Sequence, residues 1–215
     1  MQKKGFIFDL DGVIVDTAKY HYIAWKKLAD QLGFEFTQEH NELLKGVSRK
    51  RSLEILLEIG NVEASEDQKA YWMEEKNKEY LTYIRKMTAK EILPDVPKIL
   101  NFLKEEKHPI ALGSASKNAS EILERVGLLQ DFDTLVDGTH VSKAKPDPEV
   151  FLIGAEALNV TPANCVVFED AVAGIEAAKA AGMLAVGIGD KEQLGDADYV
   201  FADFTEISEE FIAQL

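Results

Sequence analysis

Short apolar runs alternate with helical patterns along most of this 215-residue chain. An apolar run from Phe6 to Phe8 predicts a first buried strand, which ends in the polar sequence Asp9-Leu10-Asp11-Gly12. Later apolar runs predict strands at 109–114, 134–136, 165–168, 184–188 and 199–201, with helices at 118–127, 148–158 and 172–181 between them. This alternation predicts an α/β fold in which helices cover both faces of a parallel sheet.

Residues 16–90 have a different pattern, because they contain no convincing strand. Apolar residues at helical spacing predict four helices, at 18–32, 38–44, 49–59 and 65–86. We therefore expect two domains: an α/β core made of residues 1–15 and 91–215, and an all-helical cap, residues 16–90, inserted after the first strand. Hinges near 14–17 and 88–93 would let the insert act as a lid over the sheet.

The charge distribution separates the same two regions. Residues 16–90 carry 13 Lys or Arg and 13 Asp or Glu, whereas the rest of the chain carries 11 and 25 and so holds the whole net charge of −14. An acidic chain disfavours nucleic acid and anionic membranes as partners. With no signal-peptide pattern and no apolar run near the length of a membrane span, we expect a cytoplasmic monomer that acts on a small molecule. The single cysteine, Cys165, is expected in the core.

Polar residues follow four of the predicted strands, and these strand ends should meet at one edge of the sheet. Asp9 and Asp11 are two positions apart, so their side chains can point the same way. The other three ends carry Ser114-Ala115-Ser116-Lys117-Asn118, Lys145 and Glu169-Asp170. Acids, lysine and hydroxyl groups in one place are suited to phosphoryl transfer.

The chemistry assigns a role to each group. Asp9 would attack a phosphate ester, and because both are negative the reaction needs a divalent cation. Asp9, Asp170 and a backbone carbonyl would offer the hard oxygen ligands that Mg²⁺ prefers. Lys145 would neutralise the transferred phosphate, and Asp11 would serve as general acid and base.

Each feature also has a purely structural explanation. Asp11-Gly12 could form a turn, and Asn118 could cap a helix with Glu121. Lys145 could be a solvated loop lysine, and Glu169-Asp170 could cap the next helix. Individually these explanations are favoured, but their coincidence at four strand ends favours a site.

The motif Asp9-x-Asp11-Gly12-x-x-x-Asp16-Thr17, followed by Ser114, Lys145 and Glu169-Asp170, resembles the four motifs of the haloacid dehalogenase superfamily. The resemblance spans the whole chain and implies a Rossmann-like core with a cap. It implies Asp9 as nucleophile, Asp11 as acid and base, Ser114 and Lys145 as phosphate ligands, and Mg²⁺ held by Asp9, Asp11, Glu169 and Asp170. A second acid at position 11 favours phosphoryl transfer over dehalogenation.

Within this superfamily the predicted insert resembles that of the β-phosphoglucomutase family. The matching features are Asp16-Thr17 with His21, the loop Lys45-Gly46-Val47-Ser48-Arg49 with Ser52, the cap residue Lys76, and Ser114-Ala115-Ser116-Lys117-Asn118. The resemblance implies that Arg49, Ser116, Lys117 and Asn118 hold the non-transferring phosphate. It also places Gly46, Val47, Ser52 and Lys76 around the sugar, and adds Trp25, Lys45, Ser48 and Ala115 as further substrate-binding residues.

The resemblance also implies that His21 couples cap closure to the position of Asp11, and Thr17 and His21 lie one turn apart on the same predicted helix face, which suits such a hinge. Lys50 and Arg51 make the 45–52 loop more basic than the family pattern, and a plain basic turn on a solvated surface is the alternative. The expected function is a β-phosphoglucomutase that acts on a sugar phosphate. The alternatives are a Mg²⁺-dependent sugar-phosphate phosphatase and a catalytically silent sensor of phosphorylated metabolites.

Overall fold

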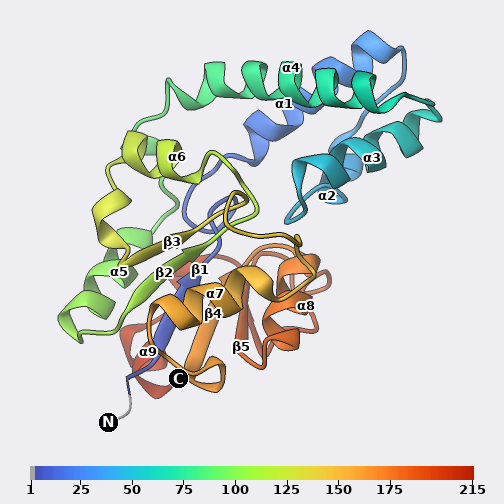
Figure 1. Cartoon of the computed structure of the whole chain (residues 1–215). Coiled ribbons are helices and arrows are strands. Elements are labelled where there is room, and N and C mark those ends of the chain that lie inside the picture. The colour runs from blue at the N-terminus through green and yellow to red at the C-terminus, as the bar shows by residue number, and fades with distance from the viewer. Residues whose placement is uncertain (1–2) are drawn as a thin grey trace.

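The computed structural model describes residues 3–215, and its centre is a six-stranded parallel sheet in the order β3-β2-β1-β4-β5-β6 (Figure 1). The strands are β1 (Gly5–Phe8), β2 (Ile110–Gly113), β3 (Thr134–Val136), β4 (Cys165–Glu169), β5 (Leu184–Ile188) and β6 (Tyr199–Phe201). The chain runs from β1 to β2 and β3 on one side, then returns to β4 on the other. The carboxyl end of β1 therefore lies at a topological switch point, where open α/β sheets bind ligands.

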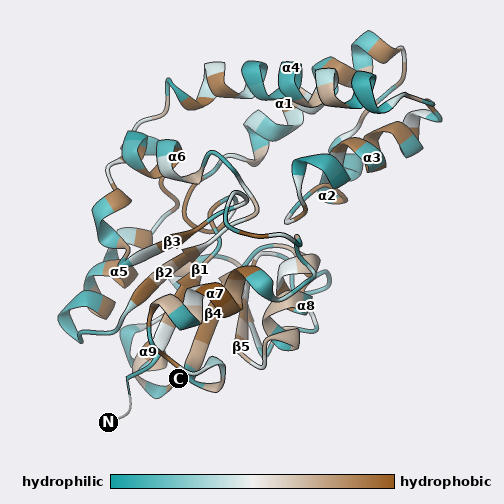
Figure 2. Cartoon of the chain, in the orientation of Figure 1, coloured by the Kyte–Doolittle hydropathy of each residue, from teal (hydrophilic) through white to brown (hydrophobic). Residues whose placement is uncertain are grey.

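Helices cover both faces of the sheet, as the sequence predicts. Phe6 and Phe8 face one cluster, which includes apolar residues of α5 (Val96–Glu105), α6 (Ala119–Val126) and α9 (Glu209–Gln214). Ile7 points the other way, into a second cluster with α7 (Glu149–Ala157) and α8 (Val172–Ala180). Figure 2 shows the central strands as apolar and the outer sides of the helices as largely polar.

Helices α5 and α9 were not among those predicted from the sequence. Helix α5 buries Val96, Ile99, Leu100 and Leu103, whose spacing gives a clear helical signal. Helix α9 has only six residues, too few for a periodic pattern. Four short 3₁₀ turns complete the connections: Ala89–Glu91, Leu129–Asp131, Pro162–Asn164 and Phe204–Glu206.

Four helices lie between β1 and α5: α1 (Ala18–Leu32), α2 (Gln38–Glu42), α3 (Arg49–Gly60) and α4 (Glu66–Ile84). No strand occurs within residues 16–90, so the predicted all-helical insert is confirmed as part of the fold. This helical unit has its own apolar core, which includes Trp25, Phe36 and Leu53. Ser48 and Ser65 cap α3 and α4 by accepting hydrogen bonds from backbone N–H groups three residues on.

The two connections between the helical unit and the sheet run side by side. Val15 and Ile92 form an antiparallel bridge, and the N–H of Asp16 donates to the carbonyl of Glu91 at 2.9 Å. Tyr80 and Ile84 of α4 belong to the same apolar cluster as Phe6 and Phe8. The end of the helical unit nearest the connections is thus packed firmly onto the sheet domain.

Cys165 is a buried free thiol in β4, as expected, and burial raises its pKa to about 11. Among the helices of residues 3–215, none has both the length and the apolar character needed to cross a membrane.

Candidate active site

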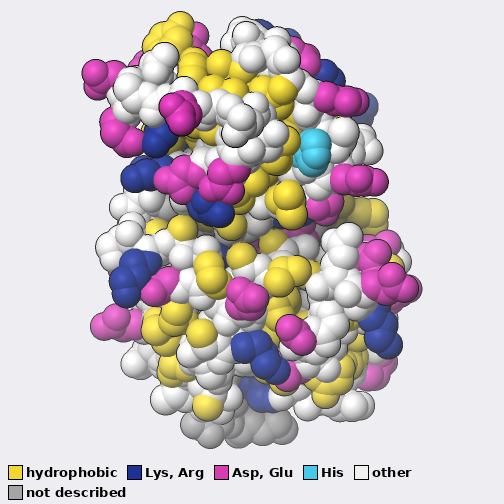
Figure 3. Space-filling view, turned by 90° about the vertical axis from the view of Figure 1, so that its right-hand side faces the viewer, with side chains coloured by type: hydrophobic (Ala, Val, Ile, Leu, Met, Phe, Trp, Pro, Cys, Tyr) yellow, Lys and Arg dark blue, Asp and Glu magenta, His cyan; other side chains and the backbone are white. Residues whose placement is uncertain are grey.

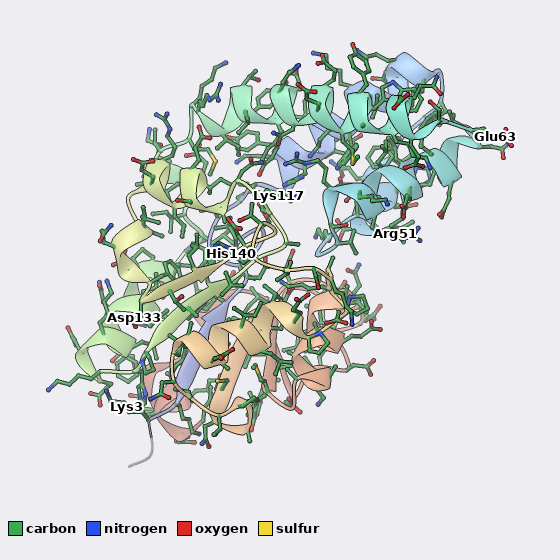
Figure 4. The ribbon with its side chains drawn as sticks, viewed as in Figure 1. Lys3, Arg51, Glu63, Lys117, Asp133 and His140 are labelled. Atoms are coloured by element: carbon green, nitrogen blue, oxygen red, sulfur yellow. The ribbon has the colours of Figure 1, made fainter. Side chains whose placement is uncertain are left out.

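A cavity of about 630 Å³ lies between the carboxyl ends of the strands and the helical unit. Eighteen of the twenty candidate residues line it, and the two exceptions, Thr17 and Glu169, are fully buried beneath its wall. Figure 4 places Lys117 and His140 in the loops above the sheet, with Arg51 in the helical unit. Figure 3, which views the junction of the two parts from the side, shows hydrophobic side chains on both sides of it. The structure therefore brings the four strand ends and the insert together around one space.

Lys145 joins two carboxylates at the floor of the cavity. Its Nζ donates to Asp9 Oδ1 at 2.6 Å, to Glu169 Oε1 at 2.5 Å and to the carbonyl of Gly113 at 3.1 Å. All three charged side chains are buried, with Lys145 3% and Glu169 0% exposed. Lys145 is therefore no solvated loop lysine but the centre of a buried ion network.

The charges at this floor shift each other's protonation. Burial, together with the charges of Glu169 and Asp11, raises the pKa of Asp9 to about 7, although Lys145 opposes the rise. Burial lowers the pKa of Lys145, but the two carboxylates outweigh it and raise that pKa overall. Lys145 thus stays protonated, and the negative charge around Asp9 is only partly compensated.

Asp170 adds a further negative group to this region, where negative charge is already only partly compensated. Burial and the charges of Glu169 and Asp9 raise its pKa well above its ordinary value, and the nearest cation, Lys45, is 3.8 Å away. A Cβ at Gly12 would lie 2.2 Å from Asp170 Oδ2, and Gly12 has a φ of +82°, so glycine is required for this approach. Asp9 is thus a buried acid and Asp170 a largely buried one, and a cation would stabilise both.

The donor set fits Mg²⁺ in particular. Within residues 3–215 there is no cluster of three or more His, Cys, Asp or Glu side chains able to form a metal cage. Mg²⁺ commonly binds through one or two carboxylates and completes its shell with water and substrate phosphate. Asp9 and Asp170 match that requirement, whereas a site for Zn²⁺ would need His or Cys ligands.

Glu169 has a different place from the one expected of a metal ligand. One carboxylate oxygen accepts from Lys145, and the other accepts from the N–H of Ala171 at 2.8 Å. Both oxygens therefore already have protein donors. The geometry makes Glu169 a partner of Lys145 and a cap for the start of α8, which corresponds in part to the structural alternative considered above.

The Asp11 carboxylate is turned toward the helical unit. It accepts a hydrogen bond from the Thr17 hydroxyl, and His21 Nε2 lies 3.7 Å from the same oxygen. Burial raises the pKa of Asp11, but His21 and Thr17 together outweigh this and lower it. Thr17 and His21 do share a face, as their spacing predicts, and both contact Asp11.

Lys76 continues this chain of contacts. Its Nζ lies 2.9 Å from His21 Nδ1, 4.6 Å from the centre of the Trp25 ring and 4.7 Å from that of Tyr80. Burial and the nearby charge of Arg49 lower the pKa of Lys76 well below its ordinary value. Aromatic faces stabilise an ammonium group here, although the site is almost closed to water.

The 44–49 loop reaches from the helical unit to the sheet domain. Lys45 binds Glu42 at 2.8 Å, and a Cβ at Gly46, where φ is +69°, would lie 2.7 Å from the Ala171 Cβ. Arg49 begins α3 and lines the cavity, as does Lys50. Arg51 instead pairs with Glu54 and Glu58 on the outer side of α3, so it does not belong to the basic group facing the site.

The loop after β2 is shaped by two hydroxyl groups. Ser114 Oγ accepts from the N–H of Ser116 at 3.1 Å, and Ser116 Oγ accepts from the N–H of Asn118 at 3.3 Å. Asn118 occupies the N-cap position of α6, but its side chain makes no capping hydrogen bond. Its amide instead donates to Asn77 Oδ1 at 3.0 Å, across to α4.

Sequence reasoning missed several residues that line the cavity. Asn41, Leu44, Met73 and Asn77 come from the helical unit, and Val141, Ser142 and Lys143 come from the loop before Lys145. Asn77 adjoins Lys76 and Leu44 adjoins Lys45, so proximity to predicted residues was the only signal. Which neighbours face the site depends on how the unit packs.

A model of the haloacid dehalogenase-like hydrolase family matches residues 3–182. The chain belongs to this family. A β-phosphoglucomutase of Bacillus subtilis is 44% identical over 211 residues, covering 97% of this chain and 93% of that protein. A phosphorylated carbohydrates phosphatase of Thermotoga maritima is 36% identical over 82% of this chain and 81% of that one. The crystal structure of a β-phosphoglucomutase from Clostridium difficile has a TM-score of 0.94 and 44% identity, covering 100% of this chain and 96% of that one.

These comparisons confirm the family assignment, and the structural match to a family member confirms the parallel-sheet fold. They leave the roles of individual residues as proposals.

Proposed function

We propose that this chain is a β-phosphoglucomutase, which interconverts β-D-glucose 1-phosphate and glucose 6-phosphate through β-glucose 1,6-bisphosphate and a phosphorylated aspartate. The observation that carries the proposal is the presence of positive groups on both walls of one cavity: Lys145 beside Asp9 on the sheet side, and Arg49 on the helical side. A phosphatase needs one phosphate site, whereas a mutase must hold a bisphosphate by both ends. The extensive similarity to two β-phosphoglucomutases supports the same conclusion.

The two parts of the chain would divide the work. Residues 1–15 and 91–215 form the catalytic core, and residues 16–90 form the cap that closes over the substrate. The paired connections at Val15 and Ile92 support a hinge there, because both strands of chain that link the two parts pass through this one place. Closure would exclude water, which otherwise competes for the phosphoryl group.

Mg²⁺ would be held by Asp9, Asp170 and the backbone carbonyl of Asp11. When bound, it supplies positive charge that offsets the repulsion between the carboxylates and the substrate phosphate. Lys145 supplies a fixed positive charge at Asp9 on its other side. Glu169 keeps Lys145 in place through the second ion pair.

In the first half of the cycle, the 6-hydroxyl of β-glucose 1-phosphate attacks the phosphoryl group on Asp9. Asp11 accepts the hydroxyl proton, the new P–O bond forms, and the Asp9 carboxylate leaves. The other phosphate would rest against Arg49, Ser116, Lys117 and Asn118. Trp25, Gly46, Val47, Ser52 and Lys76 would surround the sugar.

In the second half, the bisphosphate binds in the opposite orientation. Asp9 attacks the phosphorus at C1, and Asp11 returns its proton to the departing C1 oxygen. The products are glucose 6-phosphate and phosphorylated Asp9, so the enzyme ends as it began. A single acid at position 11 serves both directions because its proton is taken up and then given back.

One experiment tests the proposal against its alternatives. The protein is incubated with β-glucose 1-phosphate, Mg²⁺ and a trace of the 1,6-bisphosphate, and glucose 6-phosphate and free phosphate are measured. We expect isomer formation far faster than phosphate release. Rapid phosphate release with little isomer would show a sugar-phosphate phosphatase, as in the Thermotoga maritima relative. Turnover of neither kind would favour a sensor.

A further inference from the structure

The Tyr80 hydroxyl is a buried polar group without a partner. Tyr80 lies on α4 and is 0% exposed, and its Oη makes no hydrogen bond to any atom of residues 3–215. A phenol that loses water without gaining a protein partner costs about 1–3 kcal/mol. Such a group calls for an explanation, and a phenylalanine would fill the same space without that cost.

The surroundings of Tyr80 point to Asp11. The Tyr80 ring packs against His21 with 4.2 Å between ring centres, and Lys76 Nζ lies 4.7 Å above it. The hydroxyl end is close to Asp11 and Thr17, whose own hydrogen bond is formed at the junction of the two parts. Burial and the charge of Asp11 raise the pKa of Tyr80 well above its ordinary value, so the hydroxyl keeps its proton.

The Asp11 carboxylate can accept further hydrogen bonds. Thr17 and His21 both approach Oδ1, and the described chain places no donor on Oδ2. An ionised carboxylate offers about four acceptor sites, so a third donor can be accommodated. A small rotation of Asp11 or a small movement of α4 would then join it to the unpartnered hydroxyl.

We propose that Tyr80 is a positioning residue for Asp11, with its hydroxyl hydrogen-bonded to the Asp11 carboxyl group when the cap closes. The inference rests on the proposed function, since it assigns a support to that reaction's acid and base. A phenol suits this task because it donates to a carboxylate and can rotate to accept from a carboxylic acid. It can therefore hold Asp11 both before and after the proton moves, which an ammonium donor cannot do.

Tyr80→Phe tests the idea with the loss of one oxygen atom. We expect kcat for the conversion of β-glucose 1-phosphate to fall about 10-fold, a part of the roughly 10²–10⁴-fold that a positioned acid and base contributes. KM should change less than twofold. The ligand-free variant should melt about 3 °C higher, because its only loss is an unpartnered buried hydroxyl. A role in structure alone would lower the melting temperature.

Tyr83→Phe is the matched control. Tyr83 lies one turn further along α4, and its hydroxyl donates to Glu79 at 2.7 Å, away from the cavity. We expect its kcat to equal that of the wild type. A second readout uses p-nitrophenyl phosphate, whose leaving group needs no proton. The burst of nitrophenolate that accompanies phosphorylation of Asp9 should be the same in Tyr80→Phe and the wild type.

The outcomes separate this inference from the function itself. An unchanged kcat in Tyr80→Phe would overturn the inference, as would an equal loss in the nitrophenolate burst. If the wild type releases phosphate instead of forming the isomer, the mutase proposal fails. The role of Tyr80 is then tested by comparing kcat for phosphate release in Tyr80→Phe and the wild type. A wild type that does neither overturns both.

Discussion

The two walls of the cavity differ in how complete their interactions are. On the sheet wall, Lys145, Asp9 and Glu169 form a buried network with contacts of 2.5–2.6 Å. On the helical wall, Asn41 has a buried polar atom without a partner in the described chain, and so has Tyr80, which lies buried behind that wall. The charged side chains of the sheet wall are already paired with one another, whereas these polar groups on the helical side still lack hydrogen-bond partners.

This contrast suggests different costs for changes on each wall. A substitution in the ion network of the sheet wall leaves a buried charge without its partner, so it should lower both the stability of the protein and the rate of the reaction. Changing the helical wall should affect mainly those steps that need a second phosphate or a closed cap. The net charges of the two regions are consistent with this difference, because the sheet domain is strongly acidic and the electrically neutral insert adds cations such as Arg49 beside the substrate.

Asp9→Asn should have the largest effect. An amide cannot serve as the nucleophile, so both isomerisation and phosphate release should fall at least about 10⁴-fold. The measurement is steady-state turnover of β-glucose 1-phosphate and p-nitrophenyl phosphate. Retention of either activity at more than a hundredth of the wild-type rate would show that another group can take the phosphoryl group.

Lys145→Met should damage both chemistry and folding. It leaves Asp9 and Glu169 buried without their shared cation, so the free energy of unfolding should fall by about 3 kcal/mol at pH 7, and turnover should fall about 10³-fold. Denaturant titration measures the first quantity. The control is Lys143→Met on the same loop, where the side chain is 71% exposed and pairs with Asp147 at 3.3 Å. A change there of more than about 0.5 kcal/mol would mean that the loop itself is sensitive.

Arg49→Ala should distinguish the contribution of the helical wall from that of the sheet wall. Loss of a charged contact to the non-transferring phosphate should lower kcat/KM for isomerisation about 50-fold, while hydrolysis of p-nitrophenyl phosphate should change less than threefold. Arg51→Ala is the matched control, because Arg51 pairs with Glu54 and Glu58 outside the cavity. Equal losses on both substrates would remove the special role of Arg49.

The sequence predicted the sheet wall better than the helical wall. Each strand places the residues that follow it at a known edge, so Asp9, Ser114 and Asp170 could be brought together from chain order, and Lys145 could be assigned to the loop after β3. The helical residues depend on how four helices pack, which no local pattern specifies. The outward position of Arg51 could have been predicted from the sequence. Two residues along a helix turn the side chain by about 200°, away from the face that Arg49 occupies.

The partners of buried groups were hidden for a related reason. The sequence identified Glu169 as acidic and next to Asp170, but it could not show that Lys145 would occupy one of its oxygens. Tyr80 lies one turn beyond Lys76, yet a tyrosine on an amphipathic helix is ordinarily a core residue. Only the absence of a partner for its hydroxyl distinguishes it.

Mg²⁺ should stabilise the sheet wall in a pH-dependent way. The pKa of Asp9 is raised from 3.8 to about 7 by burial, so the folded state favours protonated Asp9. Asp9 therefore contributes stability that is fully present below about pH 3.8 and is lost as the pH rises through about 7. Melting temperatures with EDTA should be lower at pH 8 than at pH 6, and Mg²⁺ should raise them more at pH 8.

Asp9→Asn is the control for that prediction, since an amide does not titrate. With EDTA at pH 8 it should melt about 4 °C or more above the wild type, and Mg²⁺ should raise its melting temperature much less. An equal response to Mg²⁺ in both proteins would place the cation elsewhere.

Asn77→Ala should have the smallest effect, since it removes a neutral hydrogen bond between the two walls. Asn77 Oδ1 accepts from the Asn118 amide at 3.0 Å, which leaves the second N–H of that amide for a phosphate oxygen. Losing the acceptor frees the amide to rotate, so we expect glucose 6-phosphate to bind about threefold more weakly by calorimetry. In an Asn118→Ala background the same change should have no further effect, because the group that it orients is gone. A loss that persists there would mean that Asn77 contacts the ligand itself, and the helical wall would then be more complete before closure than its unpartnered groups indicate.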